Sequence, residues 1–193
     1  MQIIDITREL FSAPVYPGDV VPALSWSRRM AAGDAYNYSQ FLLGAHAGSH
    51  ADAPLHFLPN GADVTTLPMD VLIGECHVLD VPPGELTGAY VEQYLPGRTE
   101  RVLLKGRGQT TLSESAAEEL AARGVKLVGT DAMSIAPQGN ERPPHFALLR
   151  EGIVILENLD LSAAPPGKYF LVAAPLKLAG AEAAPLRAFL MNN

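Results

Sequence analysis

The segment HAGSHADAPLHF, residues 46–57, concentrates side chains that bind metal ions or move protons. Its first eleven residues contain three of the five histidines of the chain and one aspartate. Neutral imidazole and carboxylate groups together are ligands suited to zinc, manganese, iron or nickel. Because the chain has a single cysteine, Cys76, a cysteine-rich structural site is excluded and an open catalytic metal site is favoured.

Four side chains form the candidate set, namely His46, His50, Asp52 and His56. Gly48 and Pro54 argue against a regular helix, so we expect a bent loop to carry them. A strand would direct neighbouring side chains to opposite faces, which also favours a loop. The two oxygens of Asp52 would allow it to bridge two ions.

Ser49 lies among these residues and raises the alternative of a serine, histidine and aspartate catalytic triad. Triad members converge from different parts of a fold, and no G-x-S-x-G motif surrounds this serine. A triad is therefore disfavoured. A polar surface loop that binds nothing remains the simplest alternative to the metal site.

Two more candidates lie about a hundred residues further along the chain. His145 could be a solvated residue near a helix start, and Glu157 an exposed residue at the end of a strand. Glu157 follows an apolar run, however, and a carboxylate at the rim of a buried strand requires a partner such as a metal ion. The residues alone leave both interpretations open.

Other polar residues carry weaker indications. Asp131 could orient a ligand or cap a turn, and Tyr16 in VYPGD could line an aromatic pocket or pack on the surface. His77 is interpreted as an ordinary strand residue, and Cys76 as a small core residue.

Composition limits the possible partners and folds. The 193 residues can bury a core as one domain, residues 1–193. The formal charge of −7 disfavours nucleic acid and anionic membranes as partners, and no apolar run is long enough to span a bilayer. The N-terminal residues lack the pattern of a signal peptide, so we expect a cytoplasmic protein.

Hydrophobic patterning indicates an α/β fold with one or two mixed β-sheets flanked by helices. Helices are expected at residues 68–73, 87–95, 111–123 and 145–150. Strands are expected at residues 3–7, 38–45, 76–81, 101–105, 125–130, 153–156, 170–174 and 188–191. Two capping boxes, at Thr111 and Ser115, support the helix at 111–123.

The segment HAGSHADAPLH resembles the H-x-G-T-H-x-D-x-P-x-H signature of the metal-dependent cyclase family, which includes bacterial kynurenine formamidases and isatin hydrolases. The resemblance extends to YPGD near the N-terminus, GTD after a strand, ILENL around Glu157, and the closing APLKLAGAEAAPLRAFL. It implies a swivelling β/β/α-type single domain that forms a homodimer or homotetramer.

The resemblance also implies roles for individual residues. His46, His50 and Asp52 would bind one divalent ion, and Asp52, His145 and Glu157 a second, with zinc more expected than manganese. His56 would stay off the ions as a proton donor and acceptor. Ser49 replaces the usual threonine and keeps its hydroxyl. Tyr16 stands where the formamidases have tryptophan, which makes it a candidate substrate-binding residue.

The implied reaction is hydrolysis of an aryl formamide, most simply N-formyl-L-kynurenine to L-kynurenine and formate. A water between two divalent ions would lose a proton near neutral pH and attack the formyl carbon, with His56 as the proton shuttle. Two alternatives stay open: hydrolysis of another cyclic or aryl amide such as isatin, and a metal-binding protein without catalysis.

Overall fold

The computed structural model describes residues 1–192, and its centre is an eight-stranded mixed sheet with the order β1-β12-β11-β5-β7-β9-β10-β4. Strand β4 also pairs with β12, so the strands from β12 round to β4 form a closed ring. The strands are β1 (Gln2–Asp5), β4 (His50–Asp52), β5 (Ile73–Asp80), β7 (Arg101–Lys105), β9 (Leu127–Thr130), β10 (Val154–Glu157), β11 (Gly167–Pro175) and β12 (Ala183–Asn192).

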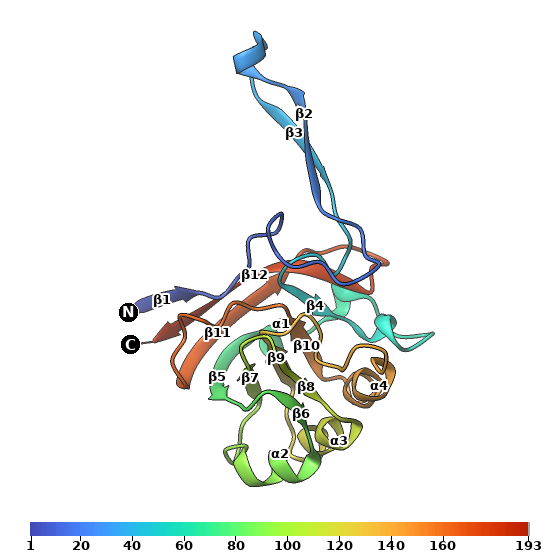
Figure 1. Ribbon diagram of the computed structural model, residues 1–193, viewed down its shortest axis with the longest axis vertical. Coiled ribbons are helices and arrows are strands. Elements are labelled where there is room, and N and C mark those ends of the chain that lie inside the picture. Colours follow the sequence, from blue (N-terminus) through green and yellow to red (C-terminus); the bar gives the residue numbers. More distant parts are fainter. Residues whose placement is uncertain (193) are drawn as a thin grey trace.

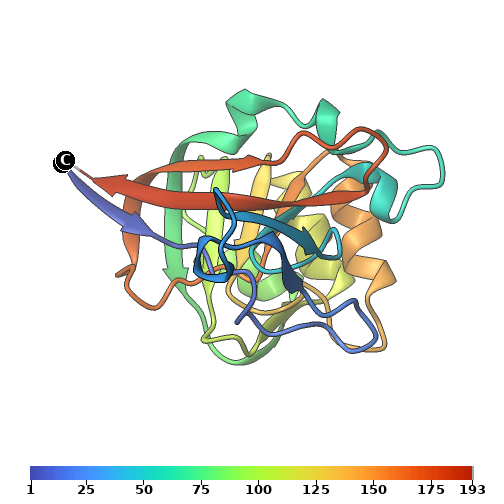
Figure 2. The same ribbon diagram turned by 90° about the horizontal axis from the view of Figure 1, so that it is seen from above.

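Four neighbouring strands, β5, β7, β9 and β10, run parallel, and the pairings that involve β1, β4, β11 and β12 are antiparallel. Strands β7, β9 and β10 are nearly continuous apolar runs, because parallel strands are covered on both faces. The start of β1 and the end of β12 lie side by side at one end of the body (Figures 1 and 2).

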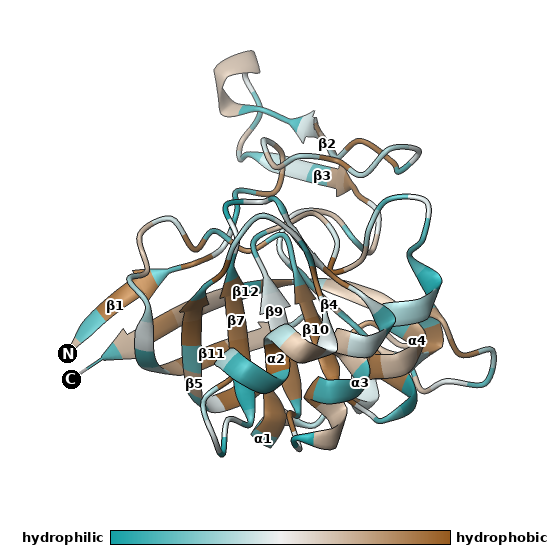
Figure 3. Ribbon diagram, turned by 60° about the horizontal axis from the view of Figure 1, so that its bottom comes forward, coloured by the Kyte–Doolittle hydropathy of each residue, from teal (hydrophilic) through white to brown (hydrophobic). Residues whose placement is uncertain are grey.

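Four helices accompany the sheet: α1 (Met69–Leu72), α2 (Gly88–Tyr94), α3 (Glu114–Ala122) and α4 (Arg142–Arg150). Helices α2, α3 and α4 lie in front of the brown, apolar strands and turn hydrophilic surfaces outward (Figure 3). Ser113 caps α3, its hydroxyl accepting a hydrogen bond from the Ala116 backbone N–H at 3.1 Å.

The apolar side chains form two cores on opposite faces of the sheet. One core fills the interior of the ring and includes Val78, Leu103, Leu127 and Leu156. The other lies between the parallel strands and the helices and includes Val102, Leu104, Val128 and Ile155. Adjacent residues of one strand therefore enter different cores, as alternation along a strand requires.

A two-stranded hairpin projects away from the body (Figure 1). It consists of β2 (Ala23–Arg28) and β3 (Tyr38–Leu42), which pair antiparallel and are joined through a 3-10 turn at Met30–Ala32. We call residues 20–45 the arm. A second small sheet, β6 (Gly84–Leu86) with β8 (Thr110–Leu112), lies within the body.

The expected α/β class with mixed sheets and flanking helices is confirmed. The helix expected at 111–123 is partly wrong, because residues 110–112 form β8 and the helix begins only after Ser113. The helix expected at 145–150 begins at Arg142, where Pro143 and Pro144 occupy its first turn. None of the helices within residues 1–192 is long and apolar enough to cross a membrane.

Candidate metal centre

His50 and Asp52 lie in β4, so the expectation of a loop at these two positions is wrong. The alternation argument applies to neighbouring residues, whereas these two are two apart and share one face of the strand. Strand β10 pairs with β4 so that Glu157 lies opposite His50 and Ile155 opposite Asp52. Since directly opposed residues share a face, His50, Asp52 and Glu157 converge on the side of the sheet covered by α4.

The loop before β4 is anchored by Gly48 and Ser49. Gly48 has a φ of +62° and its carbonyl oxygen lies 2.9 Å from His50 Nδ1, which leaves Nε2 to face the site. The Ser49 hydroxyl donates to the Asn158 carbonyl at 2.7 Å and accepts from the Arg8 N–H at 2.9 Å. The serine thus ties β4 to the residue that follows Glu157.

His145 reaches the same point from the first turns of α4. Its Nδ1 lies 2.7 Å from the Glu141 carbonyl oxygen, which favours an Nδ1–H donor and leaves Nε2 facing the carboxylates. His145 Nε2 is 3.1 Å from Glu157 Oε1 and 3.7 Å from Asp52 Oδ2. Phe57 stacks on the ring, with centroids 4.6 Å apart, and holds its plane.

Backbone and hydroxyl groups fix the Glu157 carboxylate. Its Oε1 accepts a hydrogen bond from the Ile135 N–H at 2.6 Å and from the Ser134 hydroxyl at 3.3 Å. Its Oε2 lies 3.4 Å from His50 Nε2. Asn158, directly after it, has a positive φ of 55°, a conformation that asparagine tolerates better than most residues.

His46 and His56 lie on the more open side of the site. His46 Nδ1 is 3.2 Å from Asp52 Oδ1, and its Nε2 is 3.4 Å from Glu182 Oε1. The His56 ring centroid lies 4.3 Å from that of His46 and 5.6 Å from that of His145. All five histidine and carboxylate ligand candidates and His56 are therefore brought together.

Several polar atoms at this point are buried without a hydrogen-bond partner, namely both carboxylate oxygens of Asp52 and Nε2 of His50. Asp52 is fully buried and His50 is 2% exposed. Unpaired buried polar atoms are unfavourable, so they indicate a binding partner that these side chains share. The donor atoms of His50, Asp52 and Glu157 lie within 4.8 Å of one another, which fits a divalent cation.

His46, Asp52 and His56 form a second group whose donor atoms also lie within 4.8 Å. Asp52 belongs to both groups. This division differs from the one implied by the family resemblance, which pairs His46 with His50 and leaves His56 free. The assignment of each ligand to an ion, and the role of His56, therefore stay predictions.

Charges in the site stabilise one another. Burial and the charge of Glu157 raise the pKa of Asp52. His46 and His50 lower it by a larger amount, so the resulting pKa is below its usual value. Burial likewise raises the pKa of Glu157, and His145 and His50 bring it well below its usual value.

The pKa values of His46, His50 and His145 shift in the opposite direction, above their usual values. Burial lowers the pKa of His46, but the neighbouring carboxylates, above all Asp52, raise it to about 9. Burial lowers the pKa of His145 too, and Glu157 raises it above its usual value. Protons on the histidines therefore supply the positive charge that divalent cations would supply once bound.

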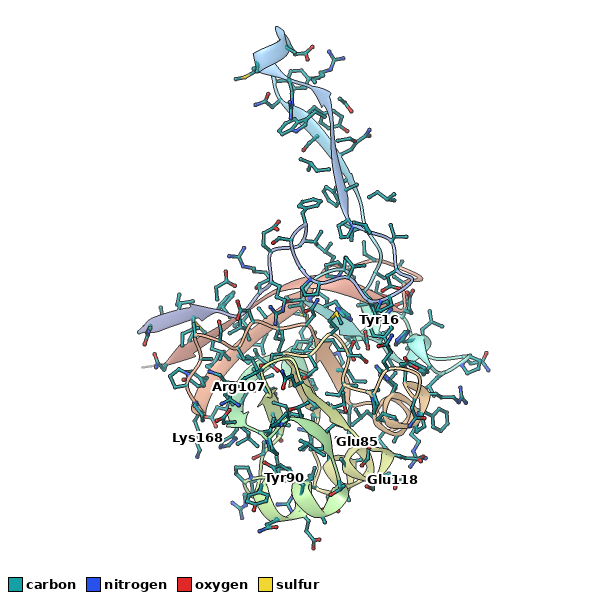
Figure 4. All side chains as sticks on the ribbon, viewed as in Figure 1. Tyr16, Glu85, Tyr90, Arg107, Glu118 and Lys168 are labelled. Atoms are coloured by element: carbon teal, nitrogen blue, oxygen red, sulfur yellow. The ribbon has the colours of Figure 1, made fainter. Side chains whose placement is uncertain are left out.

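A pocket of about 230 Å³ opens onto these side chains. Tyr16 lines this pocket. It lies at the end of the body nearest the arm, whereas Tyr90 and Glu118 lie at the opposite end of the body, away from the pocket (Figure 4). The Tyr16 hydroxyl donates to Glu141 Oε1 at 2.6 Å. Burial and this contact raise the pKa of Tyr16 to about 12, so the phenol stays protonated at neutral pH.

The remaining candidates lie outside the site. Asp131 caps a turn, its carboxylate accepting from the backbone N–H groups of residues 106, 107 and 108, and these contacts do not support a role in orienting a metal ligand. His77 lies in β5 and Cys76 is a buried core residue, as expected.

Sequence reasoning missed several residues of this site. The Ser134 hydroxyl donates to Glu157, and the Glu141 carbonyl oxygen contacts His145 Nδ1. Phe57 stacks on His145, and Met133 lines the pocket. Phe57 is the last residue of the histidine-rich segment, so its position next to His56 could have indicated that it lies in the site. Glu141 acts on His145 through a backbone carbonyl, which no side-chain pattern encodes.

The chain matches known proteins over its full length. The cyclase family model matches residues 4–137. A kynurenine formamidase of Salinibacter ruber is 37% identical over 208 residues, covering 100% of this chain and 98% of the relative. A kynurenine formamidase of Delftia acidovorans is 37% identical over 192 residues, covering 93% of this chain and 91% of the relative.

Solved structures have the same fold. A predicted metal-dependent hydrolase from Bacillus stearothermophilus superposes with a TM-score of 0.85 at 30% identity, covering 98% of this chain and 97% of that chain. Isatin hydrolase A from Labrenzia aggregata superposes with a TM-score of 0.81 at 23% identity, covering 98% and 93%. The buried histidine and carboxylate cluster, the family match and the full-length relatives agree, and this chain belongs to the cyclase family of hydrolases.

Proposed function

We propose that this protein is a metal-dependent arylformamidase, and that its substrate is N-formyl-L-kynurenine, which it hydrolyses to L-kynurenine and formate. The observation that carries the proposal is the set of buried, unpaired donor atoms on His50 and Asp52, which face Glu157 and His145 at the floor of a small pocket. Full-length relatives named kynurenine formamidase support the choice of substrate.

We further propose that the site holds two divalent ions, zinc or else manganese, with Asp52 shared between them. Two groups of donors that have Asp52 in common support this number. One contains His50 and Glu157, and the other contains His46 with His56, which we assign to proton transfer instead of an ion. His46, His50, His145 and Glu157 would supply the other ligands. Divalent ions at such a site lower the pKa of a water molecule towards 7 and polarise a carbonyl oxygen.

The protein's own part in the reaction is mainly proton transfer. Hydrolysis joins a water oxygen to the formyl carbon, breaks the bond from that carbon to the anilide nitrogen, and requires a proton on that nitrogen. His56 lies in the pocket, and burial lowers its pKa, so the neutral ring that predominates near pH 7 can accept the water proton. The resulting imidazolium then donates that proton to the leaving nitrogen.

The pocket walls suit an aromatic substrate. Tyr16, Phe57 and Met133 supply aromatic and thioether surface beside the polar floor. The hydrogen bond from Tyr16 to Glu141 fixes the phenol, and Glu141 also accepts from the Gly139 N–H at 2.6 Å. A flat aryl group would therefore meet a wall whose position is set by α4.

The test is a paired assay on protein loaded with zinc or with manganese. Formate release is measured from N-formyl-L-kynurenine, and isatinate formation from isatin, with metal content determined on the same samples. We expect formate release and little isatinate. Isatinate without formate would replace the proposed substrate by a cyclic amide, and bound metal without either product would favour a non-catalytic metal-binding protein.

A further inference from the structure

The pocket of about 230 Å³ carries negative charge at its mouth as well as at its floor. Glu157 at the floor is 4% exposed, whereas Asp19 is exposed and Glu141 half-buried, so these two carboxylates lie at the mouth. No lysine or arginine among residues 1–192 lines the pocket. The pocket is a binding site on independent grounds, because the buried Nε2 of His50 faces it without a hydrogen-bond partner in the described chain.

A tight turn fixes the position of Asp19. The backbone N–H of Asp19 donates to the Tyr16 carbonyl oxygen at 3.0 Å, and Gly18 has a φ of +99°. Proline followed by glycine with a positive φ is the pattern of a type II turn, which brings its first and last residues together. The turn therefore holds Asp19 next to Tyr16, and both residues line the pocket.

Glu141 is fixed on the other side of Tyr16. Its Oε1 accepts hydrogen bonds from the Tyr16 hydroxyl and from the Gly139 N–H, both at 2.6 Å. Because both contacts use the same oxygen, Oε2 keeps its lone pairs for a ligand. After burial and the Glu141 contact, the charge of Asp19 also raises the pKa of Tyr16, so this second carboxylate lies near the phenol as well.

The proposed substrate carries a charged group that fits this mouth. N-formyl-L-kynurenine has a formamide on one carbon of its aromatic ring, and on the neighbouring carbon a chain that ends in an ammonium and a carboxylate. When the formamide reaches His56 and the donor atoms at the floor, the amino-acid group lies towards the opening. Two carboxylates at the opening attract an ammonium and repel a carboxylate.

We propose that Asp19 and Glu141 form an ammonium subsite, through which the pocket selects aryl formamides that carry an amino group. This inference rests on the proposed function. The subsite also orients the substrate, since a free carboxylate is itself a good ligand for divalent ions. An ammonium held at the mouth keeps the amino-acid end away from the donor atoms at the floor, so that the formamide is the group that reaches them.

The first test compares four formamides by formate release from the metal-loaded protein. They are N-formyl-L-kynurenine, the amine without the carboxylate (N-formylkynuramine), the acid without the amine (deamino-N-formylkynurenine), and the aryl ketone with neither charge (ortho-formamidoacetophenone). The amine should have a kcat/KM at least equal to that of N-formyl-L-kynurenine. The acid should be about tenfold or more below it, because it loses two ion pairs and keeps the repulsion.

The second test removes the charges of the subsite and keeps its oxygens. Asp19→Asn and Glu141→Gln retain an acceptor at each position, so the contact from the Tyr16 hydroxyl should persist. In each variant the preference for N-formylkynuramine over ortho-formamidoacetophenone should fall about fivefold, through KM and with little change in kcat. The combined variant should lose about twentyfold. Asp19→Glu, which keeps the charge, should retain the preference.

Glu85→Gln is the matched control. Glu85 is an exposed carboxylate of β6, away from Tyr16 and outside the pocket (Figure 4), so its removal should leave the preference unchanged. Equal kcat/KM values for the amine and the aryl ketone in the wild-type protein would overturn the ammonium subsite and leave the proposed function standing. The same follows if Glu85→Gln lowers the preference as much as Asp19→Asn does. Formate from none of the four compounds would overturn both.

Discussion

The metal site and the arm are built in opposite ways. At the site, charged groups are buried, and each is held by the surrounding fold: Glu157 by the Ile135 N–H, His145 by the Glu141 carbonyl, and β4 by Ser49. In the arm, apolar side chains are exposed, and the pairing of β2 with β3 is the main contact that orders these residues. Charged groups are usually exposed and large apolar side chains usually buried, and both regions therefore show the reverse of this distribution.

The contrast indicates that both regions require a partner from outside the chain. Without a cation, the negative charge of the buried carboxylates is neutralised only by protons on the histidines. Without a second surface, the exposed apolar side chains stay in contact with water, which is unfavourable. The expected partner differs in kind: a divalent ion in one region and a protein surface in the other. Five further experiments test this contrast.

The largest effect should come from Asp52→Asn. The amide has no negative charge to share between two ions, so we expect turnover to fall by about a thousandfold or more and bound metal to be lost. Formate release and metal analysis measure this. Glu182→Gln, which changes a more exposed carboxylate next to His46, should keep its metal. An active, metal-loaded Asp52→Asn protein would remove this residue from the centre of the site.

His56→Ala should lower kcat by about a hundredfold to ten-thousandfold, the usual range for loss of a general acid and base. Metal content should be unchanged if His56 moves protons and binds no ion. The control is His77→Ala, which removes a histidine from β5 outside the pocket. Loss of one ion per chain would instead assign His56 to the group formed by His46 and Asp52.

Metal removal should make stability depend on pH. The pKa of His46 is about 9 in the folded protein, above its usual 6.5, so its protonated form stabilises the metal-free fold fully below pH 6.5. This contribution is lost as pH rises through about 9. The Tm of chelator-treated protein should therefore fall by roughly 5 °C between pH 6.5 and 9.5.

Metal-loaded protein at the same pH values is the control, and its Tm should change less because the cation replaces the protons. The same reasoning predicts proton release when metal is added at pH 7. Calorimetry in buffers with different ionisation enthalpies measures that release. Equal pH dependence of the two forms would contradict the view that protons and cations stabilise the same charges.

The Tyr16 and Glu141 contact should have a smaller effect, mainly on KM. Tyr16→Phe removes the hydroxyl that donates to Glu141, and KM should rise about threefold to tenfold, as expected for a hydrogen bond worth about 1 kcal/mol. Glu141→Ala should give a similar increase, and the double variant should be no worse than the larger single change. Additive effects would show that the two residues act separately.

The smallest effect should be that of Trp26→Ser on the chain measured at high dilution, where a second copy contributes nothing. Because Trp26 packs on no core residue, the free energy of unfolding should change by less than about 0.5 kcal/mol. Leu156→Ala, in the core inside the ring, should cost about 2–5 kcal/mol. Urea denaturation compares them. A large loss from Trp26→Ser would place the arm on the body of its own chain.

The predicted elements show which local signals were sufficient. Strand β7 matched its predicted bounds, and β9 and β10 were found nearly as predicted, because continuous apolar runs are strong signals. Strands β2, β4, β6 and β8 were missed. Strand β4 is three residues long and consists of polar and small residues, and its extended form depends on pairing with β10 and β12.

The sequence determined the chemical composition of the site, because imidazole and carboxylate groups at spacings of four, two and four indicate a metal site in any fold that brings them together. It also determined the α/β class and the family. The tertiary structure decided how the donors converge, through the register of β4 on β10 and the backbone carbonyl that orients His145. It also decided that residues 20–45 leave the body as an arm. Both depend on contacts between residues far apart in the chain, whose free energies no local pattern contains.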